Sequence, residues 1–275
     1  MNKNIVLTNG DLKKLQKVEL EMLEEFDRIC KKHKIDYTLS GGTLLGAVRH
    51  DGFIPWDDDI DINMTRKNYN KFIKVQKEEL NSKKFYLDCI ETNYDCGMLY
   101  AKLKRKNSLC VESLSNRNEE EQNIWIDIFP VDNISNNRIM QKYCYLKVYC
   151  LKIILMYKYN YIKDHDNKIL FNLIKFTSIF FNKEKLKSKL SKTVTKYNNI
   201  NTDYFVEYSS PYLGKQIMPN EVYSSYKYHE FEGKNFKIIK NYDIYLTTLY
   251  GNFMQLPPKE DRYPHHFIKK LKFPK

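Results

Sequence analysis

The sequence predicts an α+β fold in which a mixed sheet is flanked by helices and a helical segment is appended. Two stretches, "WDDDIDINM" (56–64) and "NIWIDIFPVD" (123–132), alternate apolar and polar residues as strands do. Residues 11–34 place apolar side chains at steps of three and four, which is typical of an amphipathic helix. From residue 138 to about residue 198 the pattern is helical and contains no glycine. We expect a core over 1–137, the helical segment over 138–200, and a C-terminal part over 201–275 that packs back on the core.

The elements of the first half follow from local patterns. Thr8 and Asp11 form a capping pair at the start of the first helix. "IDYTL" (35–39) predicts a short strand that leads into a tight turn at Gly41 and Gly42, and "TLLGAVRH" (43–50) predicts two helical turns. The strand over 56–64 comes next. It is followed by a helix over 67–81 and by strands in "FYLDCI" (85–90) and "MLYAKLKRKN" (98–107).

The second half contains fewer strand patterns. The strand over 123–132 is predicted to end at Pro130. After residue 201 the chain returns to loops and short strands. "NYDIYLTTLYG" (241–251) predicts a helix with Asn241 or Asp243 near its N-cap and Gly251 beyond its end, and "QLPPKEDRYPHH" (255–266) predicts an irregular tail.

The charge and the cysteines limit the class of protein. Lys and Arg total 46 against 34 Asp and Glu, a net charge of +12, so anionic partners such as nucleic acid, phosphorylated metabolites or membranes are expected. The six cysteines show neither CxxC spacing nor zinc-type pairing with histidine, which indicates reduced thiols. No apolar leader opens the sequence, and charges interrupt its most apolar region, 143–181. We expect a cytoplasmic protein without a membrane span, with peripheral contact at the inner membrane face as an option.

Five aspartates lie within one short stretch of this basic chain: Asp51, Asp57, Asp58, Asp59 and Asp61. In a strand, Asp57, Asp59 and Asp61 share one side, because alternate residues point to the same face. Three adjacent carboxylates repel one another unless a cation lies among them. Oxygen ligands of this kind suit Mg²⁺ or Mn²⁺, which in turn hold substrate phosphates.

Two other interpretations of these aspartates are a solvated turn and a calcium-binding loop. The alternating isoleucines and the double glycine upstream argue against the solvated turn. The calcium loop fails because Ile62 stands where that loop needs glycine and Asn68 stands where it needs glutamate. Gly41 and Gly42 lie between a predicted strand and a helix start, where backbone N–H groups can face a phosphate. Together with aspartates on the next strand, this arrangement is typical of metal-dependent nucleotidyltransferases that hold a diphosphate.

Three blocks of the sequence resemble a known family. "LSGGTLLGAVRHDGFIPWDDDIDINM" (39–64) resembles the signature of the LicD family, bacterial phosphocholine transferases related to the fukutin group. "WIDIFPVD" (125–132) and "YDIYLTTLYGNFMQLPPKEDRYPHH" (242–266) are similar to two further blocks of that family, whereas residues 138–200 match none. The resemblance implies a nucleotidyltransferase-like core. It also implies transfer of a phosphoalcohol, typically phosphocholine from CDP-choline, to a hydroxyl of a cell-surface glycan such as lipopolysaccharide, teichoic acid or capsule, with a lipid-linked acceptor as one option.

The resemblance also implies roles for individual aspartates. Asp59 and Asp61 correspond to metal ligands, and Asp57 stands first in the acidic triplet. Asp127, on a separate strand, is the predicted third carboxylate, which completes the metal site or takes the proton of the acceptor. The alternative is a carboxylate at a strand end that is bonded to backbone. We therefore predict Asp59, Asp61 and Asp127 as catalytic residues, and these three with Asp57 as ligands of Mg²⁺ or Mn²⁺.

The predicted donor-binding residues are Gly41, Gly42, Thr43, Arg49 and His50. Arg49 and His50 follow the short helix, where they can contact a donor phosphate or pair with the aspartates. 

Several other residues have a structural and a functional interpretation. Trp56 and Trp125 are expected to pack, although an aromatic face also suits a choline headgroup. His265 and His266 resemble the terminal histidine of the family, but a structural role is the simpler interpretation. "KLKRKN" (102–107) is interpreted as a solvated strand end, with diphosphate binding as the alternative. The segment 138–200 is either a plain helical subdomain or a docking element for a lipid-linked acceptor.

Two competing functions are nucleotidyl transfer, which releases pyrophosphate, and nucleic-acid binding by the +12 charge and the many tyrosines. Against the latter, the acidic cluster repels phosphates in the absence of metal, and no nucleic-acid motif is present. We expect a CDP-linked alcohol and a glycan as partners, and no nucleic acid.

Overall fold

The computed structural model of the chain describes residues 5, 7–93, 95–113, 115, 117–162, 168–209, 215–264 and 266–275. Its helices are α1 (Asn9–Lys32), α2 (Gly41–His50), α3 (Arg66–Glu79), α4 (Arg138–Lys158), α5 (Lys168–Ser178), α6 (Lys183–Val194) and α7 (Tyr242–Tyr250). Its strands are β1 (Thr38–Leu39), β2 (Asp61–Thr65), β3 (Phe85–Asp88), β4 (Ala101–Arg105), β5 (Leu109–Glu112), β6 (Trp125–Ile134), β7 (Tyr204–Glu207), β8 (Ile217–Pro219), β9 (Tyr226–Phe231), β10 (Lys234–Ile239) and β11 (Ile268–Lys272).

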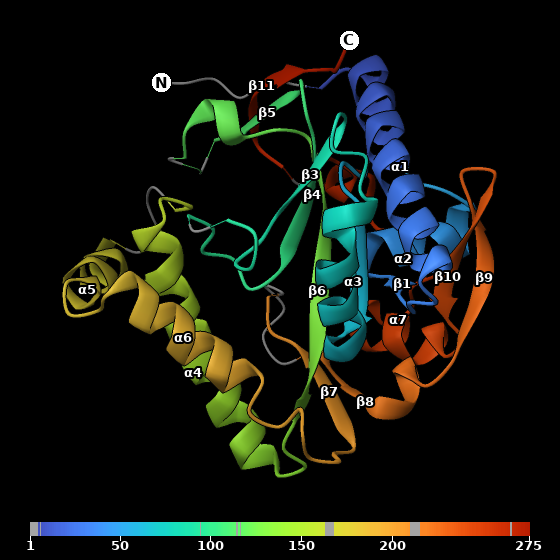
Figure 1. Cartoon of the computed structure of the whole chain (residues 1–275). Coiled ribbons are helices and arrows are strands. Elements are labelled where there is room, and N and C mark those ends of the chain that lie inside the picture. Colours follow the sequence, from blue (N-terminus) through green and yellow to red (C-terminus); the bar gives the residue numbers. More distant parts are fainter. Residues whose placement is uncertain are drawn as a thin grey trace.

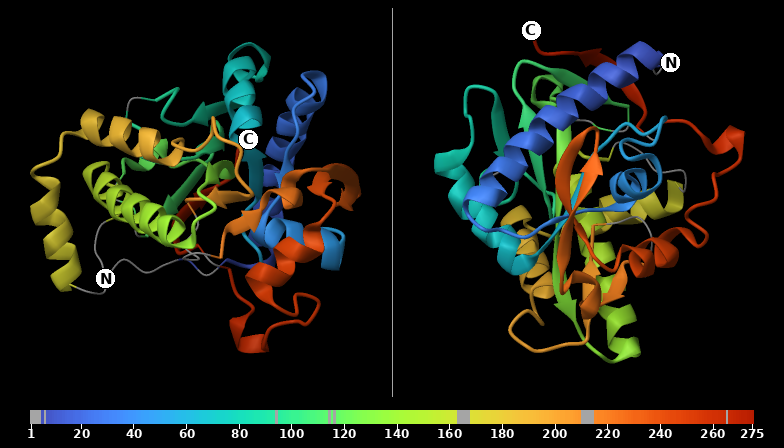
Figure 2. Two further views of the ribbon diagram at one scale, coloured as in Figure 1. Left: turned by 90° about the horizontal axis from the view of Figure 1, so that it is seen from below. Right: turned by 90° about the vertical axis from the view of Figure 1, so that its right-hand side faces the viewer.

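A mixed seven-stranded sheet forms the centre of the molecule (Figure 1). Its order is β1-β2-β6-β4-β3, with β7 beside β6 and β8 beside β7. β2 runs parallel to β6, while the other pairings are antiparallel. Helices α1 and α3 contact β6 on one side of the sheet, and α4, α5 and α6 lie on the other side (Figures 1 and 2). The predicted mixed sheet flanked by helices is confirmed.

The longest strand, β6, has different neighbours along its two halves. Residues 125–128 pair with β4, and residues 131–134 pair with β7. The prediction that this strand ends at Pro130 is wrong, because β6 continues to Ile134. Pro130 lies between the two sets of antiparallel partners, a position where a residue without an N–H disturbs neither ladder.

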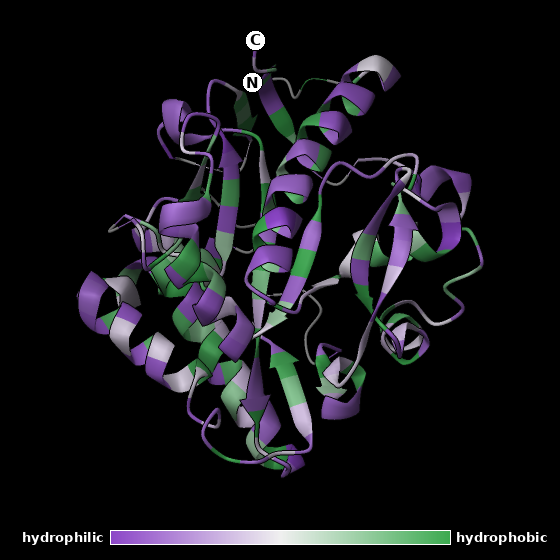
Figure 3. Ribbon diagram, turned by 45° about the vertical axis from the view of Figure 1, so that its right-hand side comes forward, coloured by the Kyte–Doolittle hydropathy of each residue, from purple (hydrophilic) through white to green (hydrophobic). Residues whose placement is uncertain are grey.

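The hydrophobic core lies between the sheet and α1, α2, α3 and α7. Thr8 and Asp11 form the predicted capping box at the start of α1. Hydrophobic and hydrophilic residues alternate along α1 (Figure 3), and its Leu23 and Phe26 are fully buried. A second cluster joins α4 and α6 to β6 and β7. Among the described helices, none combines the length and the apolarity needed to cross a bilayer.

The predicted strand over 56–64 begins later than its pattern indicates. β2 starts at Asp61, and residues 57–60 form an extended connection without strand pairing of their own. Apolar and polar residues still alternate in this connection, where Ile60 is buried. The sequence pattern alone therefore could not distinguish this loop from a strand. The strand predicted over 35–39 is likewise shorter, since β1 comprises only Thr38 and Leu39.

Candidate active site

The predicted metal ligands meet in one cavity of about 860 Å³. Asp57 and Asp59 enter it from the connection before β2, Asp61 from the first position of β2, and Asp127 from β6. Asp61 and Asp127 are register partners in the parallel β2–β6 pairing, so their side chains lie on the same face. The cavity is also lined by Phe129 of β6 and by segments more distant in sequence: Tyr100, Glu207, Ser209, Gln216, Tyr245, and residues from Tyr250 to Asp261.

The two glycines at the start of α2 make room for the carboxylates. A Cβ on Gly41 would lie 2.9 Å from Oδ2 of Asp61, and a Cβ on Gly42 would lie 2.8 Å from Oδ2 of Asp57. Both contacts are far shorter than an ordinary van der Waals distance. Gly41 also adopts φ +54, a left-handed conformation that favours glycine. The N–H of Gly41 donates to the hydroxyl of Tyr245 at 3.3 Å.

The carboxylates lie close together, and Asp57 and Asp127 are buried. Burial raises the pKa of Asp57, and the charges of Asp59 and Asp58 raise it further. Burial also raises the pKa of Asp61, with Asp59 and Asp127 as the next causes. Within the described part of the chain, Oδ2 of Asp57 has no hydrogen-bond partner. An oxygen-only set of this kind fits a hard divalent cation such as Mg²⁺ or Mn²⁺, because the cation would remove the repulsion that now disfavours ionisation.

Metal-ligating geometry is also present within the acidic triplet itself. Asp57, Asp58 and Asp59 each offer a carboxylate oxygen, and these atoms lie within 4.8 Å of one another. Of the three, only Asp57 and Asp59 line the cavity. Asp58 is turned to the other side, where Oδ2 accepts the backbone N–H of His266 at 3.1 Å and Oδ1 lies 3.3 Å from its Nδ1.

His266 brings the C-terminal tail back to the acidic triplet. Burial lowers its pKa, but the hydrogen bond with Asp58 and the charge of Asp59 outweigh this effect and raise the pKa to about 9. Its ring packs edge-on against Trp125, with centroids 5.6 Å apart. The structure thus gives His266 a supporting place beside the carboxylates. His265, the other histidine considered from the sequence, lies outside the described residues.

Asp127 has a cationic neighbour that the sequence interpretation missed. Nζ of Lys102 lies 3.2 Å from Oδ1 of Asp127, and the two residues are register partners on β4 and β6. Burial raises the pKa of Asp127, while the ammonium of Lys102 lowers it; the net shift is upward. Trp125 donates its indole N–H to Oδ2 at 3.3 Å, and Lys102 lies 3.9 Å from the centre of the Trp125 ring.

The interpretation of residues 102–107 as a solvated strand end is wrong for residues 102–105. Lys102, Lys104 and Arg105 are all buried. Each has an acidic partner: Lys104 lies 2.5 Å from Asp88, and Arg105 lies 3.0 Å from Glu21. Buried cations of this kind require a paired carboxylate, and that pairing comes from other strands and from α1.

The remaining predicted donor-binding residues, Arg49, His50 and Thr43, have different surroundings. Arg49 lines the cavity, and its Nη1 donates to the carbonyls of Phe253 at 2.7 Å and Gln255 at 3.2 Å. Its Nε donates to His50 Nε2 at 3.0 Å. Thr43 is buried behind the cavity, where its hydroxyl accepts the N–H of Asp61 at 2.8 Å. Thr43 therefore fixes the start of β2.

Glu19 is a further buried carboxylate near the acidic triplet. Burial raises its pKa, followed by the charges of Asp59 and Asp58. In α1 it occupies the same face as Leu12, Leu15 and Met22, and this acidic residue within an apolar stripe is a signal that the sequence did contain.

Comparison with known proteins places these observations in a family. Residues 34–152 match the family model described as LicD/FKTN/FKRP, nucleotidyltransferase domain. The lipopolysaccharide cholinephosphotransferase LicD of Haemophilus influenzae is 35% identical over 265 residues, which cover 93% of this chain and 96% of that protein. An uncharacterised protein of Rickettsia prowazekii is 29% identical over 39% of this chain and 41% of its own length.

Proposed function

Because the chain belongs to the LicD/FKTN/FKRP family, we propose that it is a phosphotransferase that moves phosphocholine from CDP-choline to a hydroxyl of lipopolysaccharide with the help of Mg²⁺ or Mn²⁺. The observation that supports this most directly is the cavity that is lined both by four carboxylates and by a wall of aromatic side chains. The core over 1–137 is proposed to be nucleotidyltransferase-like, in keeping with the family model.

In this proposal Asp57, Asp59 and Asp61 hold the divalent cation. Three observations support that role: the burial of Asp57, the raised pKa values of Asp57 and Asp61, and the space provided by Gly41 and Gly42. A cation bound there supplies positive charge to the diphosphate of the donor. The Asp61 carboxylate is held in a fixed position, because the hydroxyl of Thr43 and the β2–β6 pairing anchor the backbone of Asp61.

Asp127 is the proposed general base. The hydroxyl oxygen of the acceptor forms a bond to the phosphorus that bears choline, the bond from that phosphorus to the bridging oxygen breaks, and CMP leaves with its electron pair. Asp127 takes the hydroxyl proton, for which its raised pKa is favourable. Lys102 and Trp125 both donate hydrogen bonds to Oδ2 of Asp127, which supports a fixed orientation of the carboxylate, whereas Oδ1 has no hydrogen-bond partner among the described residues.

The aromatic wall supports choline as the transferred alcohol. Trp56, Tyr100, Phe129, Tyr245 and Phe253 all line the cavity. The rings of Tyr100 and Phe129 lie 4.6 Å apart between centroids and form a continuous surface. A quaternary ammonium group is attracted to the faces of such rings, and it has no hydrogen-bond donor that would need a polar partner.

The test is product analysis with the purified protein, CDP-choline, Mg²⁺ and lipopolysaccharide. We expect CMP release that depends on the acceptor, and phosphocholine on the glycan. Asp59→Asn should abolish both products. Asp51→Asn is a matched control, because Asp51 belongs to the same acidic stretch but is exposed and does not line the cavity. Asp51 has φ 54, a conformation that asparagine tolerates.

The competing functions give different results in the same system. A nucleotidyltransferase offered CTP and phosphocholine releases pyrophosphate, and acceptor-dependent CMP from CDP-choline is then absent. Equal CMP release from CDP-ethanolamine or CDP-glycerol would refute choline as the preferred alcohol while leaving the transfer chemistry intact. Normal turnover of Asp59→Asn at saturating Mg²⁺ would refute the proposed site.

A further inference from the structure

The net positive charge of the chain is concentrated in one layer of the molecule. Residues 138–200 contain fourteen Lys and Arg against three Asp and Glu, a net charge of +11 out of +12 for the whole chain. The helices α4, α5 and α6 of this segment form the layer opposite α1 and α3 (Figure 1). The remainder of the protein is therefore almost neutral, and an anionic partner would be attracted mainly to this layer.

The three helices differ in how they bury their apolar residues. α4 and α6 pack against each other and against β6 and β7 through Val148, Leu151, Leu155, Leu186 and Leu190. These residues of α4 and α6 therefore lie in a hydrophobic core. α5 lies outermost, on the side away from the sheet, in two perpendicular views (Figures 1 and 2).

α5 and the turn after it present an apolar stripe to solvent. Ile169, Leu173, Phe176 and Phe180 are 83%, 56%, 59% and 73% exposed. Their spacing of four, three and four residues places them on one face of the helix. Phe176 and Phe180 contact each other edge-to-face, with centroids 5.4 Å apart. Ile174, on another face of α5, is buried, so the helix is anchored with its stripe outward.

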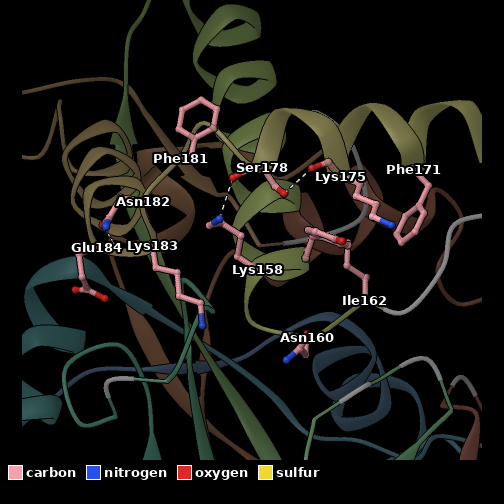
Figure 4. A pocket seen from close by; sticks show the side chains of 11 residues that line it. Lys158, Asn160, Ile162, Phe171, Lys175, Ser178, Phe181, Asn182, Lys183 and Glu184 are labelled. Atoms are coloured by element: carbon pink, nitrogen blue, oxygen red, sulfur yellow. Dashed lines mark hydrogen bonds between the residues drawn. The ribbon is translucent and has the colours of Figure 1, made fainter.

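A basic cavity lies on the inner side of this helix (Figure 4). It measures about 770 Å³, and Lys158, Lys175 and Lys183 line it from the end of α4, the last turn of α5 and the start of α6. Nζ of Lys158 donates to the carbonyl of Ser178 at 2.8 Å. Glu184 is the only acidic residue among the described residues that line it, so cations outnumber anions in the cavity.

We propose that α5 docks the protein onto an anionic lipid membrane. The stripe enters the boundary between headgroups and acyl chains, and the lysines of the surrounding basic layer add electrostatic attraction to the lipid phosphates. An apolar face flanked by lysines is the pattern of helices that lie in a membrane interface. A second copy of the chain is disfavoured as the occupant, because two layers of +11 would face each other.

Vesicle flotation tests this proposal without donor or acceptor, so its failure is distinguishable from failure of the proposed function. The wild type is mixed with phosphatidylcholine vesicles that contain or lack phosphatidylglycerol, at low and at high salt. We expect flotation with the anionic vesicles at low salt, and loss of flotation at high salt or without phosphatidylglycerol.

A matched pair of variants locates the contact. Leu173→Glu/Phe176→Glu changes the stripe, and Ile139→Glu/Tyr143→Glu changes the start of α4, where the two side chains are 80% and 57% exposed. Both variants alter the net charge equally. We expect the first to weaken vesicle binding by more than about tenfold and the second by less than about twofold, because only the first removes apolar side chains that enter the lipid.

Three results would overturn the proposal. The wild type could remain unbound to anionic vesicles at low salt, or the two variants could bind equally well. The wild type could also elute as a dimer that Leu173→Glu/Phe176→Glu converts to a monomer, which would identify a second copy as the occupant. Lys175→Gln/Lys183→Gln gives an independent readout, since it should reduce the dependence of binding on salt while leaving the stripe unchanged.

Discussion

The substitution Gly42→Ala is expected to displace a metal ligand without destabilising the fold. A Cβ at residue 42 would lie 2.8 Å from Oδ2 of Asp57, whereas ordinary contact begins at 3.4 Å. The carboxylate of Asp57 must therefore withdraw by roughly 0.6 Å, the difference between these distances. Displacements of about 1 Å at catalytic groups lower rates by about 10²-fold. We expect turnover of Gly42→Ala to fall by about 10- to 100-fold, and the Mg²⁺ concentration needed for half-maximal turnover to rise.

The fold should tolerate the same substitution. Gly42 lies within α2, and its φ is outside the left-handed region, so alanine imposes no backbone strain. Alanine is more favourable than glycine in a helix by about 0.5–1 kcal/mol, which offsets part of the local crowding. We expect the free energy of unfolding to stay within about 1 kcal/mol of the wild type.

The assay compares CMP release, Mg²⁺ titration and denaturant unfolding for three proteins. Gly10→Ala is the control, because the nearest atom to its new Cβ is 3.7 Å away and the residue lies in the first turn of α1. Wild-type turnover and Mg²⁺ requirement in Gly42→Ala would refute the role of Asp57. If Asp57→Asn retained full activity while Gly42→Ala lost it, crowding would act on another group.

The other predictions concern charge. Asp59→Asn should lose donor affinity and turnover together. Asp127→Asn should keep donor affinity and slow transfer by about 10²- to 10⁴-fold. If both variants lost donor affinity equally, Asp127 would be a metal ligand. Mg²⁺ at about 100 times its Kd should stabilise the wild type by about 2.7 kcal/mol, and EDTA should reverse the rise in Tm; an unchanged Tm would argue against the site. Burial raises the pKa of Asp88, but Lys104 and Asn93 outweigh it and lower the pKa overall. The stabilisation by Asp88 is thus present above about pH 4 and lost as the pH falls through the folded-state pKa, so Asp88→Asn should reduce the loss of stability on acidification, measured by denaturant unfolding.

Local patterns predicted the elements whose formation depends on neighbouring residues. Thr8 and Asp11 are three residues apart, and their reciprocal hydrogen bonds need no tertiary contact. The helix at 242–250 ends before Gly251, which adopts a positive φ as expected of a residue at a helix end. The four predicted metal ligands line one cavity because chain alternation and strand pairing act together.

Features that depend on distant partners were not accessible to the same reasoning. Asp58 turns away from Asp57 and Asp59 because its partner is His266, 208 residues later in the chain. Lys102 is buried beside Asp127 through the β4–β6 register, and nothing in "KLKRKN" distinguishes it from a solvated lysine. Gly41 and Gly42 were interpreted as space for a phosphate, but the space nearest to them is occupied by Asp61 and Asp57. That distinction requires the position of the following strand.

The acidic stretch in a basic chain has a physical explanation in the separation of the two kinds of charge. Eleven of the thirteen lysines of 138–200 belong to α4, α5 and α6, whereas the site aspartates lie on β2, on β6 and in the connection before β2. If the lysines lay among the carboxylates, they would neutralise them and displace a divalent cation. Lys102 beside Asp127 is the exception, and the pKa of the Asp127 carboxyl remains raised despite this lysine. Because the carboxylates and the lysines are separated in the fold, the carboxylates can bind a divalent cation and the lysines can contact lipid phosphates. High salt should therefore release the protein from anionic vesicles without removing its capacity to bind Mg²⁺ in the buried site, because screening acts strongly on exposed charges and weakly on buried ones.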